Sequence, residues 1–241
     1  MRFHYFGTLE NLHSLKTAEL KFKKVERKDV KIAIIDDDTF PYLSILTKHK
    51  FNIDTFKDVT NIESMSTYDI ILCDIQGVGK ELNTNYQGAY LLKEIYERFP
   101  SKVLISYTAH ATDITFNKYL QYAEFSMKKD ASSEDWVEKL DQAISLVSNP
   151  ENRWVRTRDM LLKRGVPLFE LSLLEDEFVY RVINRKTFEN FPPPKITKSI
   201  SDEIEPIIDD FCKILKLLKI GSNNIVVFLT IQYYCLSLRH E

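Results

Sequence analysis

Cysteine is scarce in this sequence, and its distribution argues against several classes of protein. The three cysteines are odd in number and far apart, and none shows the paired spacing of a zinc site. Cys73 lies within a strand-like apolar run, where we expect a buried, reduced thiol. Since the N-terminus also lacks the continuous apolar segment of a signal peptide, we expect a cytoplasmic protein.

Long apolar runs and an excess of charge of one sign are also missing. The longest near-apolar run, residues 225–238, includes Thr230, Gln232 and Ser237 and falls short of the roughly 20 apolar residues that a membrane span needs. We interpret this run as a buried helix and expect no attachment to a membrane. The net charge of −2 gives no overall signature of binding to a polyanion.

Composition and periodicity divide the chain into three parts. Its 241 residues are long for one compact α/β domain and sufficient for two, and 44% hydrophobic residues can form a core without metals or disulfides. Residues 1–29 are basic and have no clear period, which is typical of a solvated N-terminal arm. We expect an α/β domain in residues 30–148 and, because the strand-like runs stop there, a helical domain in residues 149–241.

Strand-like runs alternate with helical patterns in the middle of the chain. The runs are near-continuous in apolar residues, as in parallel strands that are covered on both faces. Helical patterns between them, such as that of residues 89–99, indicate right-handed βαβ units in one parallel sheet. The strong runs are KIAII, DIILC, KVLIS and AEFSM, which begin at residues 31, 69, 102 and 123, and FNIDTF from residue 51 is a weaker fifth.

The C-terminal part is predicted to contain four helices. The first carries Leu162 on its apolar face and ends near Gly165, and Pro167 can open the second. The third begins near Ser201, has acids early and lysines late, and the run of residues 225–238 forms the fourth. The apolar faces of the second and third are formed by Leu171, Leu174, Phe178 and Val182, and by Ile204, Ile207, Ile208, Phe211, Leu215 and Leu218.

Polar side chains follow four of the strand-like runs, at the point where each run ends. In an open α/β sheet the ligand site lies beyond the carboxyl ends of the strands, so these side chains are expected to converge. Each acid alone would be interpreted as a turn or cap residue, but the ordered set is hard to obtain by chance. The set comprises Asp36, Asp37 and Asp38 after the first run, Asp74 after the second, Thr108 and Ala109 after the third, and Lys128 after the last.

In this order the residues resemble the receiver domain of two-component response regulators, over about residues 30–148. The resemblance implies a flavodoxin-like, doubly wound, five-stranded parallel sheet. It also implies a phosphoryl group transferred from a histidine kinase or phosphotransfer protein, in a protein that catalyses only its own phosphorylation and dephosphorylation. The implied roles are Mg²⁺ binding by Asp36, Asp37 and Asp74, phosphoacceptor for Asp74, catalytic cation for Lys128, catalytic and switch hydroxyl for Thr108, companion switch for Phe125, and helix start for Gly88.

The chemistry of a receiver explains these residue types. Clustered carboxylates repel each other, and Mg²⁺ relieves the repulsion while it binds phosphate oxygens. Asp74 would be the nucleophile that forms an acyl phosphate, and Lys128 would supply a mobile positive charge. Transfer of the phosphoryl group then needs mainly in-line positioning and electrostatic stabilisation.

Three features depart from the receiver pattern. Lys129 stands after Lys128, where the family usually has a proline. The loop between Asp74 and Gly88 is several residues longer than usual. The segment between Asp37 and Asp74 is shorter, so we expect the first two helices of the domain to be stunted.

Three alternatives remain open at this point. The receiver could be degenerate and act as an adaptor, or the chain could be a haloacid-dehalogenase-like phosphatase that uses Asp36 and Asp38, although Phe40 departs from that motif. A DNA-binding output is the third, because residues 161–174 loosely mimic a helix-turn-helix. The would-be recognition helix, LFELSLLEDEF, is acidic and apolar, so we expect no nucleic-acid partner. We therefore predict that the C-terminal helices form a homodimer or bind a protein partner.

Overall fold

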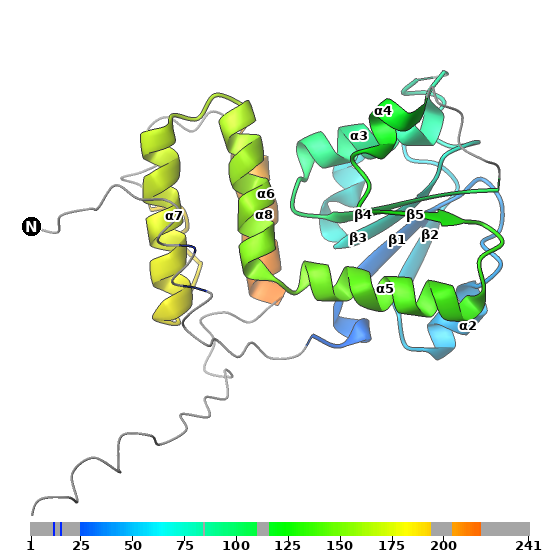
Figure 1. The fold of residues 1–241 in the computed structure, drawn as a ribbon, viewed down its shortest axis with the longest axis horizontal. Helices are drawn as coiled ribbons and strands as arrows, with labels where there is room; N and C mark the ends of the chain where they lie inside the picture. The colour runs from blue at the N-terminus through cyan, green and yellow to red at the C-terminus, as the bar shows by residue number, and fades with distance from the viewer. Residues whose placement is uncertain are drawn as a thin grey trace, which may run out of the picture.

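The computed structural model describes the α/β part almost completely and most of the helical part (Figure 1). The predicted fourth C-terminal helix, residues 225–238, lies outside the described residues. No helix among those described is both long enough and apolar enough to cross a membrane. The described residues are 12, 15, 25–83, 85–109, 116–193 and 204–217.

A five-stranded parallel sheet forms the centre of the α/β part, with the strand order β2-β1-β3-β4-β5. This is the flavodoxin-like order, so the predicted fold class is confirmed. All five residues of the central strand β3 are buried, as its uninterrupted apolar run predicted. The strands are β1 (Lys31–Ile35), β2 (Asn52–Phe56), β3 (Ile70–Asp74), β4 (Val103–Thr108) and β5 (Phe125–Lys128).

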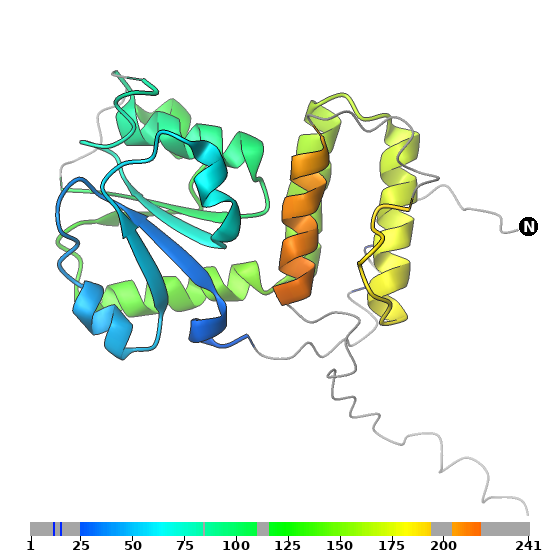
Figure 2. The same cartoon turned by 180° about the vertical axis from the view of Figure 1, so that it is seen from behind.

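Helices cover both faces of the sheet (Figures 1 and 2). The helices α2 (Leu43–Lys48) and α5 (Ser133–Val147) share one apolar core with the sheet, and α3 (Gln87–Arg98) lies on the other face beside α4 (Asn117–Leu120). The first two helical elements of the α/β part, α2 and the 3-10 helix η2 (Ile62–Thr67), have six residues each, so the expected stunting is confirmed.

In the described residues of the helical part, the helices are α6 (Pro150–Lys163), α7 (Leu168–Ile183) and α8 (Glu205–Leu217). Its apolar core includes every residue of the two predicted faces that is described. Leu162 is an exception to the predictions, since it is 52% exposed while Leu161 is fully buried. Neighbouring residues of a helix point in directions about 100° apart, so the burial of Leu161 turns Leu162 toward solvent.

Two leucines from the N-terminal segment complete the core of the helical part. Leu12 and Leu15 are 7% and 9% exposed and belong to the same cluster as Trp154 and Phe178. Their spacing of three residues suits one side of a helical turn. At these two positions the N-terminal segment is therefore packed against the helical part and is not a solvated arm.

A buried ion pair joins the helical part to the amino ends of the strands. Lys102, just before β4, lies 2.9 Å from Asp210 of α8, and the two side chains are 2% and 1% exposed. The Lys102 ammonium also donates to the carbonyl oxygens of Ser66 and Tyr68, at 3.1 and 2.5 Å. Ser101 donates to the other carboxylate oxygen of Asp210. Both charges are thus surrounded by partners, as buried charges require.

Replacement of Asp210 by alanine should lower the free energy of unfolding by about 3–5 kcal/mol, because Lys102 would remain buried without its counter-charge. The neighbouring Asp209 is exposed and provides the matched control, so Asp209→Ala should change stability by less than about 0.5 kcal/mol. Urea unfolding of the full chain measures both variants. Equal stability of the two variants would contradict the assigned role of the pair.

Candidate functional site

Asp74 is the last residue of the central strand and is almost entirely enclosed. The residue is 4% exposed, and its Oδ1 accepts a hydrogen bond from the backbone N–H of Gln76 at 3.2 Å. The first turn of α3 lies directly against it, because a Cβ placed on Gly88 would be 1.8 Å from the main-chain oxygen of Asp74. Only glycine fits at that position, which explains the glycine in the first turn of this helix.

Lys129 provides the positive charge at the site. Its Nζ lies 2.5 Å from Asp74 Oδ2 and 3.2 Å from Asp36 Oδ1. We expected Lys128 in this place, but Lys128 is exposed and pairs in register with Thr108 at the end of β5. The prediction was wrong by one residue because side chains alternate along a strand, and Lys129 continues the inward side on which Met127 lies.

Asp36 is the second buried acid of the site, and each of its oxygens has a hydrogen-bond donor. Its Oδ1 accepts from the backbone N–H of Asp38 at 2.9 Å as well as from Lys129. Its Oδ2 accepts from the hydroxyl of Tyr107 at 2.9 Å. Sequence reasoning missed Tyr107, although a tyrosine within a strand-like apolar run signals that its hydroxyl needs a polar partner.

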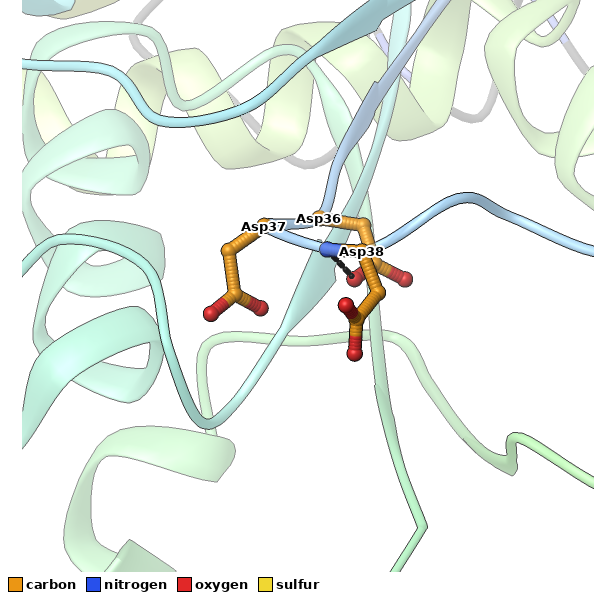
Figure 3. Close-up of side chains that lie close together, drawn as sticks. All are labelled: Asp36, Asp37 and Asp38. Carbon is orange, nitrogen blue, oxygen red and sulfur yellow. Dashed lines mark hydrogen bonds between the residues drawn. The ribbon is translucent and has the colours of Figure 1, made fainter.

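Three carboxylates gather at the end of β1 (Figure 3). One oxygen from each of Asp36, Asp37 and Asp38 lies within 4.8 Å of the others, and Asp37 and Asp38 are exposed. The carboxylate of Asp37 faces Gly77, where an added Cβ would lie 2.3 Å from its oxygens. A set of clustered carboxylate oxygens fits a hard cation such as Mg²⁺, which keeps several waters and needs only one or two carboxylates.

The long loop between β3 and α3 is held in place from both sides. The backbone N–H of Gly77 donates to Gln87 Oε1 at 2.8 Å, and that of Gly79 donates to Asp58 Oδ1 at 2.6 Å. Val78 between them is fully buried. Residues 77–79 of this loop are therefore held by hydrogen bonds and burial, and Gly77 lies beside Asp37 with a φ of +90° that favours glycine.

The two predicted switch residues lie at opposite ends of the paired segment of β4 and β5. Thr108 ends β4 beside β5, is half-buried, and its carbonyl oxygen accepts the N–H of Lys129 at 2.9 Å. Phe125 pairs with Ile105, three positions earlier in the ladder, and packs against the core under α5. The structure thus brings Thr108 to the edge that carries Asp74, and it leaves Phe125 at the start of β5.

Burial and charge act on the acceptor pair in opposite directions. Burial raises the pKa of Asp74 above its ordinary value, and the contact with Lys129 only partly offsets this rise. Burial also disfavours the charge of Lys129, but its hydrogen bonds to Asp74 and Asp36 outweigh that cost and raise the pKa of the ammonium. Contact with the two acids thus favours the charged form of Lys129, whereas burial favours the neutral form of Asp74.

Removal of the Lys129 charge should raise the pKa of Asp74 further, since the contact that opposes burial is lost. Carboxyl ¹³C NMR titration should show this rise in Lys129→Met and no change in Lys128→Met. A raised pKa means that Asp74 favours folding below its unfolded-state pKa and loses this contribution as the pH rises through its folded-state pKa. Equal shifts in the two variants would contradict the assignment to Lys129.

Comparison with known proteins was made by sequence and by structure. No family model matches the chain, and neither does any curated protein sequence. Structural neighbours were found, and they are receiver domains that cover about half of the chain.

Three of these neighbours illustrate the likeness. A CheY-like receiver domain protein from Methanospirillum hungatei has 19% identity and a TM-score of 0.41, over 48% of this chain and 94% of its own. A response regulator from Thermotoga maritima has 16% identity and a TM-score of 0.40, over 48% and 98%. The receiver domain of RstA from Klebsiella pneumoniae has 18% identity and a TM-score of 0.39, over 47% and 97%.

The chain is thus similar to response regulator receiver domains over its α/β part, and the rest of the described chain is helical. At such low identity the likeness concerns the fold alone. The assignment of the fold rests on the strand order β2-β1-β3-β4-β5 itself.

Proposed function

We propose that this protein is a response regulator that accepts a phosphoryl group on Asp74 from a histidine kinase or phosphotransfer protein. The observation that supports the proposal most strongly is the enclosed Asp74 at the end of the central strand, with Lys129 on one of its oxygens. The acidic cluster of Asp36, Asp37 and Asp38 stands at the end of the adjacent strand. A structural ion pair alone would not explain why exposed acids gather at the same edge.

The chemistry follows from these groups. A carboxylate oxygen of Asp74 forms a bond to phosphorus, while the bond from phosphorus to the donor nitrogen breaks and the donor imidazole takes up a proton. The flexible side chain of Lys129 allows its ammonium to approach the phosphoryl oxygens as negative charge develops on them. Mg²⁺, held by Asp36, Asp37 and Asp74, would neutralise charge on the transferred group. Thr108 stands on the neighbouring strand end, where its hydroxyl can donate to a phosphoryl oxygen.

Incubation with acetyl phosphate and Mg²⁺ should add one phosphoryl mass to the intact chain in mass spectrometry. Asp74→Asn should abolish the added mass, because an amide is not a nucleophile of this kind, and EDTA should do the same. Lys129→Ala should slow the reaction by about 100-fold, as the loss of a preorganised charge in a catalytic site commonly does.

Lys128→Ala is the matched control, since it removes the neighbouring exposed lysine, and it should leave the rate within about twofold. A phosphoryl adduct that persists in Asp74→Asn would contradict the assignment of Asp74 as the acceptor. A wild-type chain that takes up no phosphoryl group would instead favour a degenerate receiver that serves as an adaptor.

We propose that the helical part is the output, through self-association or through a protein partner. Three apolar side chains near the turn between α6 and α7 support this proposal, since Leu162, Leu168 and Phe169 are 52%, 66% and 55% exposed. The acidic and apolar sequence of α7 argues against a recognition helix for DNA. The predicted homodimer and the switch role of Phe125 also belong to this proposal.

Thr108→Ala should separate phosphorylation from response. The variant keeps Asp74 and Lys129, so it should gain the phosphoryl mass, but it lacks the hydroxyl that distinguishes the two states. Sedimentation of the full chain with and without acetyl phosphate measures the response. If Thr108→Ala shows the same phosphorylation-dependent change in sedimentation as the wild type, the switch lies elsewhere.

A further inference from the structure

A buried tyrosine hydroxyl holds one of the two enclosed acids. Tyr107 is 1% exposed, and its hydroxyl lies 2.9 Å from Asp36 Oδ2 and 3.3 Å from the carbonyl oxygen of Ile35. The hydroxyl is the donor to Asp36, because an ionised carboxylate can only accept. Hydrogen bonds to a buried charged group are stronger than those between neutral groups, so this contact fixes the orientation of the carboxylate.

The core of the protein, and not the site, determines where this hydroxyl lies. The ring of Tyr107 makes edge-to-face contacts with Phe40 and Trp136, with ring centroids 5.7 and 5.6 Å apart. These rings belong to the apolar core between the sheet and α5. Aromatic packing therefore fixes the position of the ring, and the hydroxyl reaches Asp36 from the side of the core. Removal of the hydroxyl alone leaves the contacts between the rings in place.

The hydrogen bond from Tyr107 continues into the rest of the site. The opposite oxygen of Asp36 contacts Lys129 at 3.2 Å, and Lys129 contacts Asp74 at 2.5 Å. A rotation of the Asp36 carboxylate would change its distance to Lys129, while Lys129 itself stays paired with Asp74. The Lys129 ammonium also lies 5.7 Å from the centroid of the Tyr107 ring, but the hydroxyl of Tyr107 donates to Asp36. Removal of the hydroxyl alone therefore acts on the site through Asp36.

We propose that Tyr107 is a positioning residue that orients the Asp36 carboxylate toward Mg²⁺ and Lys129. This inference rests on the phosphoacceptor function proposed above. Groups that orient metal-binding side chains commonly change metal affinity by 10- to 100-fold when they are removed. The hydroxyl should affect the affinity for Mg²⁺ more than the rate at saturating Mg²⁺, because the reacting groups of Asp74 and Lys129 remain in place.

Calorimetric titration of the unphosphorylated full chain with Mg²⁺ tests the inference. Tyr107→Phe keeps the ring and removes only the hydroxyl, and it should weaken Mg²⁺ binding by about tenfold. The rate of phosphorylation by acetyl phosphate at saturating Mg²⁺ should stay within about threefold of the wild type. Tyr68→Phe is the matched control, since Tyr68 also donates to an aspartate, Asp54, at 2.9 Å on the same sheet, and it should leave Mg²⁺ affinity unchanged.

A double-variant cycle tests whether the hydroxyl acts through Asp36. In an Asp36→Asn background, Tyr107→Phe should change Mg²⁺ affinity by less than about twofold, because the carboxylate that it orients is gone. Circular dichroism at the titration temperature verifies that each variant is folded. Wild-type affinity in folded Tyr107→Phe, or an undiminished effect in the Asp36→Asn background, would overturn the inference. A wild-type chain that binds no Mg²⁺ would overturn the metal-dependent function on which it rests.

Discussion

The enclosed charge of Asp74 sets the requirements for everything around it. Its side chain is 5% exposed at the end of the central strand, so the charge must find partners within the protein. Lys129 supplies the opposite charge and shares it with Asp36, while Gly88 leaves the space that the main chain of Asp74 needs. The acids and the lysine form one electrostatic unit, because removal of Lys129 would leave two buried acids without their shared counter-charge.

A second buried charge system lies at the opposite ends of the strands, and α3 runs between the two. Lys102 and Asp210 join the sheet to α8 at the amino ends, far along the strands from Asp74. The first turn of α3 lies against Asp74 at Gly88, and near the other end of the helix Glu97 pairs with Lys163 of α6 at 3.3 Å. The helical part therefore contacts an element whose first turn lies directly against Asp74.

The parts of the fold that the sequence predicted are those that local patterns determine. Near-continuous apolar runs predicted the parallel strands, and Pro167 marked a helix start that the structure confirms. The convergence of Asp36 and Asp74 followed from topology, since the carboxyl ends of parallel strands meet at one edge. The choice between Lys128 and Lys129 depended on the exact end of β5 and on which of its side chains point inward. The sequence pattern missed this choice because the ends of elements are its least certain feature.

The contacts that escaped prediction join residues far apart in the sequence, but two of them left a local signal. Asp210 lies between Ile207 and Phe211 on the buried side of α8, and a charge on the apolar face of a helix requires a buried partner. Tyr107 sits in a strand whose other residues are apolar or small, so its hydroxyl likewise needs an acceptor. The signal reveals that a partner exists and leaves its identity open, because many acids and lysines could serve. Only the packing of the sheet against the helices makes Lys102 the partner of Asp210 and Asp36 the partner of Tyr107.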